Sequence, residues 1–90
     1  MSRFPLGRLL ATPGALRALE AAGVHVFGYV GRHARGDWGD VCPSDARAND
    51  RALLEGTRLF SAYDLPGGGR VWIITEADRA ATTVLLPEDY

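Results

Sequence analysis

The 90-residue sequence contains no lysine and only one cysteine, and its apolar runs are only a few residues long. The lone cysteine, Cys42, excludes an intrachain disulfide and a cysteine-based metal site. We expect it to be a small buried or half-buried side chain. A membrane-spanning helix needs about 20 apolar residues, so no membrane segment is expected. The first ten residues lack the long apolar region of a signal peptide, which favours a cytoplasmic protein.

The sequence also lacks an excess of positive or negative charge. Ten arginines stand against eleven acidic residues, which gives a formal net charge of −1. Such a balance provides no general attraction to nucleic acid or to a membrane surface. Because every basic residue is an arginine, the chain does carry planar groups suited to two-point contacts with carboxylates or phosphates. The length predicts one small domain over residues 1–90.

Three segments before residue 57 have helical features. They are Pro13–Ala22, Val24–Ala34 and Asp45–Glu55. Thr12 is a good N-cap for the first helix, and Gly23 is a good residue to end it. The second segment fits both strand alternation and a helical stripe, and two internal glycines weaken both readings; we favour a helix. Ser44 is expected to cap the third helix, whose apolar stripe is thin.

From Thr57 onward the apolar residues repeat every second position. This indicates strands over Thr57–Tyr63, Arg70–Thr75 and Thr82–Leu86, separated by turns at 64–69 and 76–81. In the first strand, alternation places Arg58 and Phe60 on the face opposite Ser61 and Tyr63. The predicted fold class is therefore α+β, with two to three N-terminal helices followed by a three-stranded antiparallel β-meander.

One cluster of chemically active side chains lies between residues 33 and 40. One interpretation makes His33 an acid/base group with the carboxylates of Asp37 and Asp40 nearby; another makes the three residues ligands of a divalent metal. The structural interpretation is the stronger one. In it Trp38 fills the core, the neighbouring glycines permit a turn, and the two aspartates bond to nearby backbone. We therefore expect no metal site.

A second cluster occupies the last hairpin. Glu76, Asp78 and Arg79 lie in the turn, and Arg79 is suited to bind a phosphate or carboxylate at two points. Arg58 on the neighbouring strand is predicted to face the same surface. A solvated turn with a local ion pair explains the same residues and is favoured. Gly67–Gly69 opens no helix and lacks the phosphate-loop motif, so no cofactor is expected.

Several stretches together resemble a family of small "plasmid-related" proteins of bacterial plasmids and integrative elements. The resemblance spans most of the chain and lies in the segments 2–7, 11–16, 32–40, 58–63, 72–79 and 85–90. It implies a mobile-element context and an accessory protein that binds a host or element-encoded protein, anti-defence action included. Arginine, tryptophan and tyrosine dominate binding hot spots, so Trp38, Arg58, Arg79 and Tyr90 are the expected contacts.

The order of helices and strands is also similar in plan to barnase/RelE-type ribonucleases, which cleave RNA without a metal. That resemblance implies RNA as a substrate, Arg58 and Arg79 on the phosphate, and His33 or Glu76 as the acid/base group. The sequence departs from the pattern because the last hairpin carries Asp78–Arg79 where a histidine is expected. Whether the chain is an enzyme stays open. Exposed edge strands of a small sheet also make a homodimer an expectation.

Overall fold

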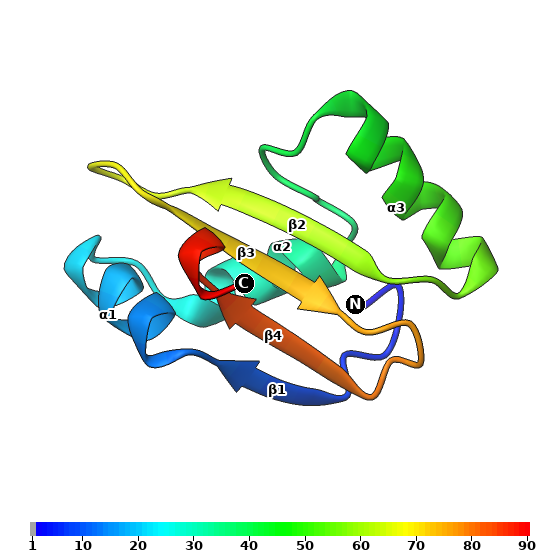
Figure 1. Cartoon of the computed structure of the whole chain (residues 1–90), viewed down its shortest axis with the longest axis horizontal. Coiled ribbons are helices and arrows are strands. Elements are labelled where there is room, and N and C mark those ends of the chain that lie inside the picture. The colour runs from blue at the N-terminus through cyan, green and yellow to red at the C-terminus, as the bar shows by residue number, and fades with distance from the viewer. Residues whose placement is uncertain (1) are drawn as a thin grey trace.

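The computed structural model describes residues 2–90, in which three α-helices and four strands are followed by a short 3₁₀ turn (Figure 1). In chain order they are β1 (Arg8–Ala11), α1 (Pro13–Ala21), α2 (Val26–Ala34), α3 (Pro43–Glu55), β2 (Leu59–Asp64), β3 (Arg70–Thr75), β4 (Ala81–Leu85) and η1 (Pro87–Asp89). The α+β class is confirmed. None of the helices in residues 2–90 is long and apolar enough to cross a membrane.

The sheet has four strands in the order β1-β4-β3-β2. The predicted meander is present, because β2, β3 and β4 pair antiparallel in sequence order. The prediction of a purely antiparallel three-stranded sheet is wrong, since β1 adds a parallel strand beside β4. Its four residues, Arg8–Ala11, are too few to show alternation, and their partner strand lies about seventy residues further along the chain. No local signal marks such a strand.

The helices agree closely with the sequence. Thr12 caps α1 by accepting a hydrogen bond from Ala15 N at 3.1 Å, as predicted. The ambiguous second segment is a helix from Val26. The third prediction needs correction: α3 begins at Pro43, its N-cap is Cys42 rather than Ser44, and Cys42 makes no side-chain capping bond. Cys42 is exposed, contrary to the buried or half-buried side chain expected.

The two faces of the sheet differ. Residues of the inner face are completely buried: Leu59, Ser61, Tyr63, Val71, Ile73, Thr75, Thr82 and Val84. Tyr63, Val71, Ile73 and Val84 of this set share a core with α1 and α2, whereas Leu59 belongs to a second core with Trp38 and Ala52 of α3. The register places Phe60, Trp72, Ile74, Thr83 and Leu10 together on the outer face. Figure 1 shows η1 in front of this face, and the Tyr90 ring packs edge-on against Trp72. The α-helices thus leave the outer face uncovered, and its residues range from the buried Ile74 to the half-buried Phe60, Trp72 and Thr83.

Helix α3 lies beside β2 and closes that edge of the sheet (Figure 1). The buried side chain of Asn49 donates to Phe60 O at 2.6 Å and accepts from Phe60 N at 3.0 Å. Further along, Ala62 N donates to Trp38 O, and Ala62 O accepts from Asp40 N. The carboxylate of Asp40 then accepts from Asp64 N. The backbone groups of β2 that point away from β3 are therefore hydrogen-bonded at residues 60 and 62 and at the amide of residue 64.

Candidate functional site

His33, the predicted acid/base group, lies in the core between α2 and the inner face of the sheet. It is completely buried. Its ring is edge-on to Phe4 at 5.3 Å and to Trp38 at 5.6 Å between centroids. Nδ1 lies 2.5 Å from Ser61 Oγ, and Nε2 lies 2.9 Å from Thr75 Oγ1. Both ring nitrogens are therefore occupied by protein groups, and neither reaches solvent.

The hydrogen bonds around His33 form a chain whose direction is fixed at one end. The carbonyl of Leu6 can only accept, so the Thr82 hydroxyl donates to it at 2.7 Å. Thr82 Oγ1 then accepts from Thr75 Oγ1 at 2.8 Å, which uses the only proton of Thr75. Thr75 must accept from Nε2–H of His33, and Ser61 donates to the unprotonated Nδ1. The chain thus selects the neutral Nε2–H tautomer.

The electrostatics of this pocket agree with that tautomer. Burial, together with the positive charge of Arg79, lowers the pKa of His33 to about 4. A general acid/base is most effective when its pKa lies near the working pH and when it can touch the substrate. His33 meets neither condition in this structure. The role of His33 is structural, because its two hydrogen bonds join α2 to β2 and β3.

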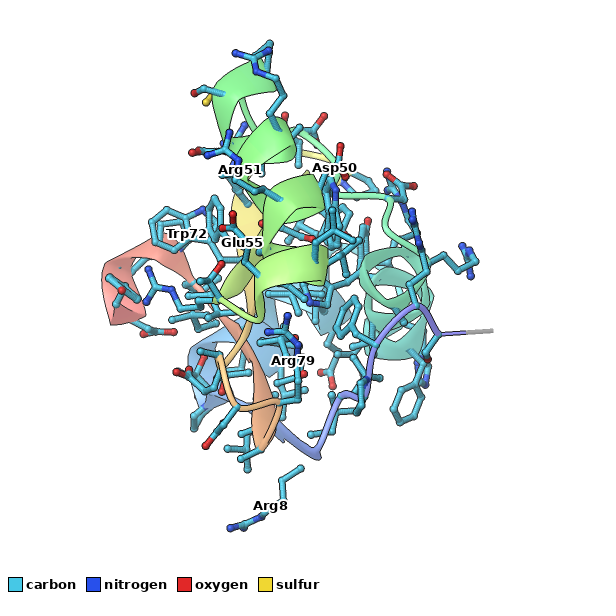
Figure 2. All side chains as sticks on the ribbon, turned by 90° about the vertical axis from the view of Figure 1, so that its right-hand side faces the viewer. Arg8, Asp50, Arg51, Glu55, Trp72 and Arg79 are labelled. Atoms are coloured by element: carbon cyan, nitrogen blue, oxygen red, sulfur yellow. The ribbon has the colours of Figure 1, made fainter. Side chains whose placement is uncertain are left out.

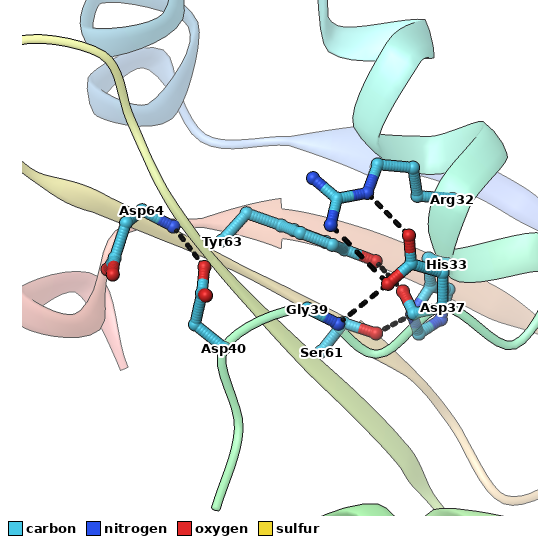
Figure 3. A network of polar contacts seen from close by, with 8 residues as sticks. All are labelled: Arg32, His33, Asp37, Gly39, Asp40, Ser61, Tyr63 and Asp64. Atoms are coloured by element: carbon cyan, nitrogen blue, oxygen red, sulfur yellow. Dashed lines mark hydrogen bonds and ion pairs between the residues drawn. The ribbon is translucent and has the colours of Figure 1, made fainter.

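The loop from residue 36 to 40 follows the structural interpretation (Figure 3). Arg32 Nε donates to Asp37 Oδ2 at 2.7 Å, and the hydrogen bond to Arg32 lowers the pKa of Asp37. Asp37 Oδ1 also accepts from Gly39 N at 3.2 Å. The Arg32 guanidinium lies 4.7 Å from the ring centroid of Tyr63, whose hydroxyl donates to Asp37 O at 2.6 Å. Burial raises the pKa of Tyr63 to about 12.

Gly39 is required at its position by a close approach of two backbone segments. It has φ +73°, and a Cβ there would lie 2.2 Å from Ala62 O. Trp38 beside it is only 6% exposed and donates from Nε1 to Asp50 Oδ1 at 3.1 Å. It therefore presents little surface to a partner. Within residues 2–90, no three histidine, cysteine or acidic side chains are grouped closely enough to hold a metal.

Arg79 binds the protein's own backbone. Its guanidinium donates to three carbonyls: Thr57 O at 2.7 Å, Glu76 O at 3.1 Å and Ala52 O at 3.1 Å. The last of these carbonyls belongs to the final turns of α3, beneath which Figure 2 shows Arg79. Arg79 also has φ +61°, a left-handed backbone that normally favours glycine. The side-chain bonds explain why an arginine occupies the position. Glu76 is exposed in the same turn.

Arg58 lies on the other side of the sheet from His33. Its Nη1 donates to the Tyr90 hydroxyl at 2.6 Å, and its guanidinium carbon lies 5.6 Å from the centre of the Tyr90 ring. The four residues of the predicted ribonuclease site therefore do not form one cleft. His33 is sealed beneath the inner face, Arg58 lies on the outer face, and Arg79 is engaged at the end of the hairpin.

Arg58 and Tyr90 instead belong to a hollow on the outer face, which we call the aromatic hollow. Its volume is about 210 Å³, and its lining residues are Arg58, Phe60, Trp72, Ile74 and Tyr90. The rings are packed edge-on, with centroids 5.1 Å apart for Phe60 and Trp72 and 5.8 Å apart for Trp72 and Tyr90. Viewed along the sheet, Trp72 lies on the η1 side, away from α2 (Figure 2).

Comparison of the chain with protein-family models, curated proteins and solved structures gives no match. The chain's function is therefore inferred from its own geometry. Two of the four predicted contact residues, Arg58 and Tyr90, meet in the aromatic hollow. Sequence reasoning missed Phe60, Trp72 and Ile74 as its walls. Alternation did place Phe60 with Arg58, but the return of Tyr90 across the sheet has no sequence signal.

Proposed function

We propose that this chain is a small accessory protein of a mobile genetic element that acts by binding another protein, and that the aromatic hollow is its docking site. The observation that carries the proposal is the hollow itself. Three aromatic rings and one arginine surround a volume of about 210 Å³ on the sheet face that the α-helices leave uncovered. Binding hot spots are enriched in tryptophan, tyrosine and arginine in such pockets.

The chemistry of the walls supports a partner of one kind. The floor and sides are apolar, formed by Phe60, Trp72 and Ile74, and the volume suits one large apolar side chain. Among the described residues the Arg58 guanidinium makes one hydrogen bond, to Tyr90, so its other donors face solvent. A carboxylate is the group that this arginine would bind at two points. The partner is thus a protein segment with a large apolar residue beside an aspartate or glutamate.

The mobile-element context comes from the resemblance to plasmid-related proteins. It makes a host or element-encoded protein the partner, a protein of host defence among them. The ribonuclease alternative has less support, because one of its two acid/base candidates, His33, is buried, and because His33 and Arg58 lie on different sides of the sheet. RNA would also need a basic surface, whereas the chain has a net charge of −1.

The experiment selects random peptides displayed on phage against the immobilised protein. We expect enriched peptides to share one large apolar residue next to an acidic residue. The variants Arg58→Glu and Tyr90→Ala should lose these peptides, because both residues line the hollow and are exposed. Leu54→Ala is the matched control, since it removes an apolar side chain that is 89% exposed on α3 and does not line the hollow.

Binding of a selected peptide to purified protein is then measured by calorimetry and by the fluorescence of Trp72. Loss of binding of at least about tenfold in Arg58→Glu, with Leu54→Ala unchanged, would support the proposal. Equal binding by the wild type and both hollow variants would contradict it. So would metal-independent RNA cleavage that Arg58→Glu and Arg79→Ala abolish.

A further inference from the structure

The two edges of the sheet are treated differently by the fold. The outward groups of β2 are bonded by Asn49 and by the 38–40 segment, as described above. Strand β1 forms the opposite edge, and all four of its residues are exposed, with Leu9 and Leu10 each 42% exposed. An open edge strand with apolar side chains is a template for pairing with another strand.

The parallel pairing with β4 determines which groups of β1 remain free. Arg8 N donates to Ala80 O, and Thr12 N donates to Val84 O, both at 2.9 Å. In a parallel ladder alternate residues bond to the same neighbour, so residues 8, 10 and 12 face β4. The N–H and C=O groups of Leu9 and Ala11 therefore point outward. In residues 2–90 no hydrogen bond joins these groups to another segment.

We infer that β1 pairs antiparallel with β1 of a second copy of this chain, around a two-fold axis at Leu10. The free groups lie symmetrically on either side of Leu10, at residues 9 and 11. With the axis at Leu10, Leu9 of each copy bonds to Ala11 of the other in hydrogen-bonded pairs. The two Leu10 side chains then meet in the close, non-hydrogen-bonded position.

The charges at the ends of β1 complement each other in this register. Arg8 of one copy lies opposite Thr12 of the second copy. The Thr12 hydroxyl donates to Asp89 Oδ2 at 2.7 Å, which places that carboxylate beside the end of the strand. Arg8 and Thr12 alternate with Leu10 and so lie on the outer face, where η1 also lies. Each end of the pairing would thus bring Arg8 near Asp89 of the other copy.

The ends of the strand limit the size of the interface. Pro13 has no N–H to donate, and Gly7 turns away with φ +66°. Pairing is confined to about five residues of each copy. Such a short strand pair buries much less surface area than the interface of a stable dimer, so we expect a reversible dimer of micromolar affinity or weaker. The paired sheets would be continuous and would carry two aromatic hollows on the same face.

Sedimentation of the full chain over a concentration series tests the inference. We expect the wild-type mass to rise toward that of a dimer, and Leu10→Asp to remain monomeric because two like charges would meet at the axis. Leu16→Asp, at a leucine 47% exposed on α1, is the control and should still dimerise. A wild type that stays monomeric up to roughly 1 mM would overturn the inference.

Cysteine crosslinking tests the register without relying on a charged variant. Cα atoms in a non-hydrogen-bonded antiparallel pair are about 4.5 Å apart, which a disulfide can span. In a Cys42→Ser background, Leu10→Cys should form a disulfide-linked dimer on mild oxidation, whereas Leu9→Cys, which faces Ala11, should not. More crosslinking of Leu9→Cys than of Leu10→Cys would overturn the register. The inference does not depend on the proposed function, because neither measurement involves the aromatic hollow.

Discussion

Burial of His33 makes the stability of this protein depend on pH in a defined window. The folded chain holds His33 neutral with a pKa of about 4, whereas an unfolded histidine has a pKa of about 6.5. Between these values the unfolded chain binds a proton that the folded chain does not. The free energy of unfolding should therefore fall as the pH drops below 6.5, and this contribution should level off below pH 4.

The size of the effect follows from the same two pKa values. Proton linkage gives a loss of about 2 kcal/mol at pH 5 and about 3 kcal/mol near pH 4. Small domains are stabilised by about 5–15 kcal/mol in total, so the loss should be easy to measure. Protonation would also place a second proton on Nδ1, which now accepts from Ser61. The Ser61 hydroxyl would then lose its acceptor, while the hydrogen bonds from Nε2 through Thr75 and Thr82 to Leu6 would stay as they are.

The assay is urea unfolding, followed by tryptophan fluorescence, at pH 7 and pH 5. His33→Gln keeps one donor and one acceptor but does not titrate, so it should lose at least about 1.5 kcal/mol less than the wild type between the two pH values. His25→Gln is the control, because that histidine lies outside the core. Identical pH dependence of the wild type and His33→Gln would refute the reasoning.

Three further predictions test the local contacts. Asn49→Leu should destabilise the fold by about 2–4 kcal/mol in urea unfolding, because it leaves the N–H and C=O of residue 60 without partners; wild-type stability in this variant would contradict the edge assignment. Gly39→Ala should lower the free energy of unfolding by at least about 3 kcal/mol, because its Cβ would meet Ala62 O. Gly67 also has a positive φ, +81°, but nothing lies within 4 Å of a Cβ there, so Gly67→Ala should cost only about 1 kcal/mol. Equal shifts in melting temperature for the two variants would count against the close approach at Gly39. Arg79→Ala should lose about 2–3 kcal/mol, and Arg79→Gly should lose less because glycine relieves the left-handed backbone; the reverse order in thermal unfolding would disprove this account.

The parts of the fold that the sequence predicts are those with local causes. The meander follows from alternation and turn residues, and α1 follows from Thr12 and the proline after it. Strand β1 could not be predicted, because its existence depends on a partner at the far end of the chain. Helix α3 was predicted with the wrong cap because a serine two residues inside looks like a good N-cap.

The candidate site shows the same division. Arg58 and Phe60 were placed on one face by period-two spacing, and the register with β3 adds Trp72 and Ile74. Histidine, aspartate and tryptophan between residues 33 and 40 resembled a reactive cluster, yet their polar groups form hydrogen bonds with other residues of the protein. Composition cannot distinguish a polar group that serves a substrate from one that satisfies a buried neighbour.

The pairing of β1 with β4 has a consequence for synthesis of the protein. Strand β1 is translated before the meander but pairs with β4, and α1 and α2 cover strands that all follow residue 58. Emerging helices therefore have no apolar surface to cover until the meander has been translated. Joining such distant segments is also the slow, entropically costly step of folding. The nascent chain should stay unfolded and in need of protection until β4 leaves the ribosome, and it should then fold in one cooperative event.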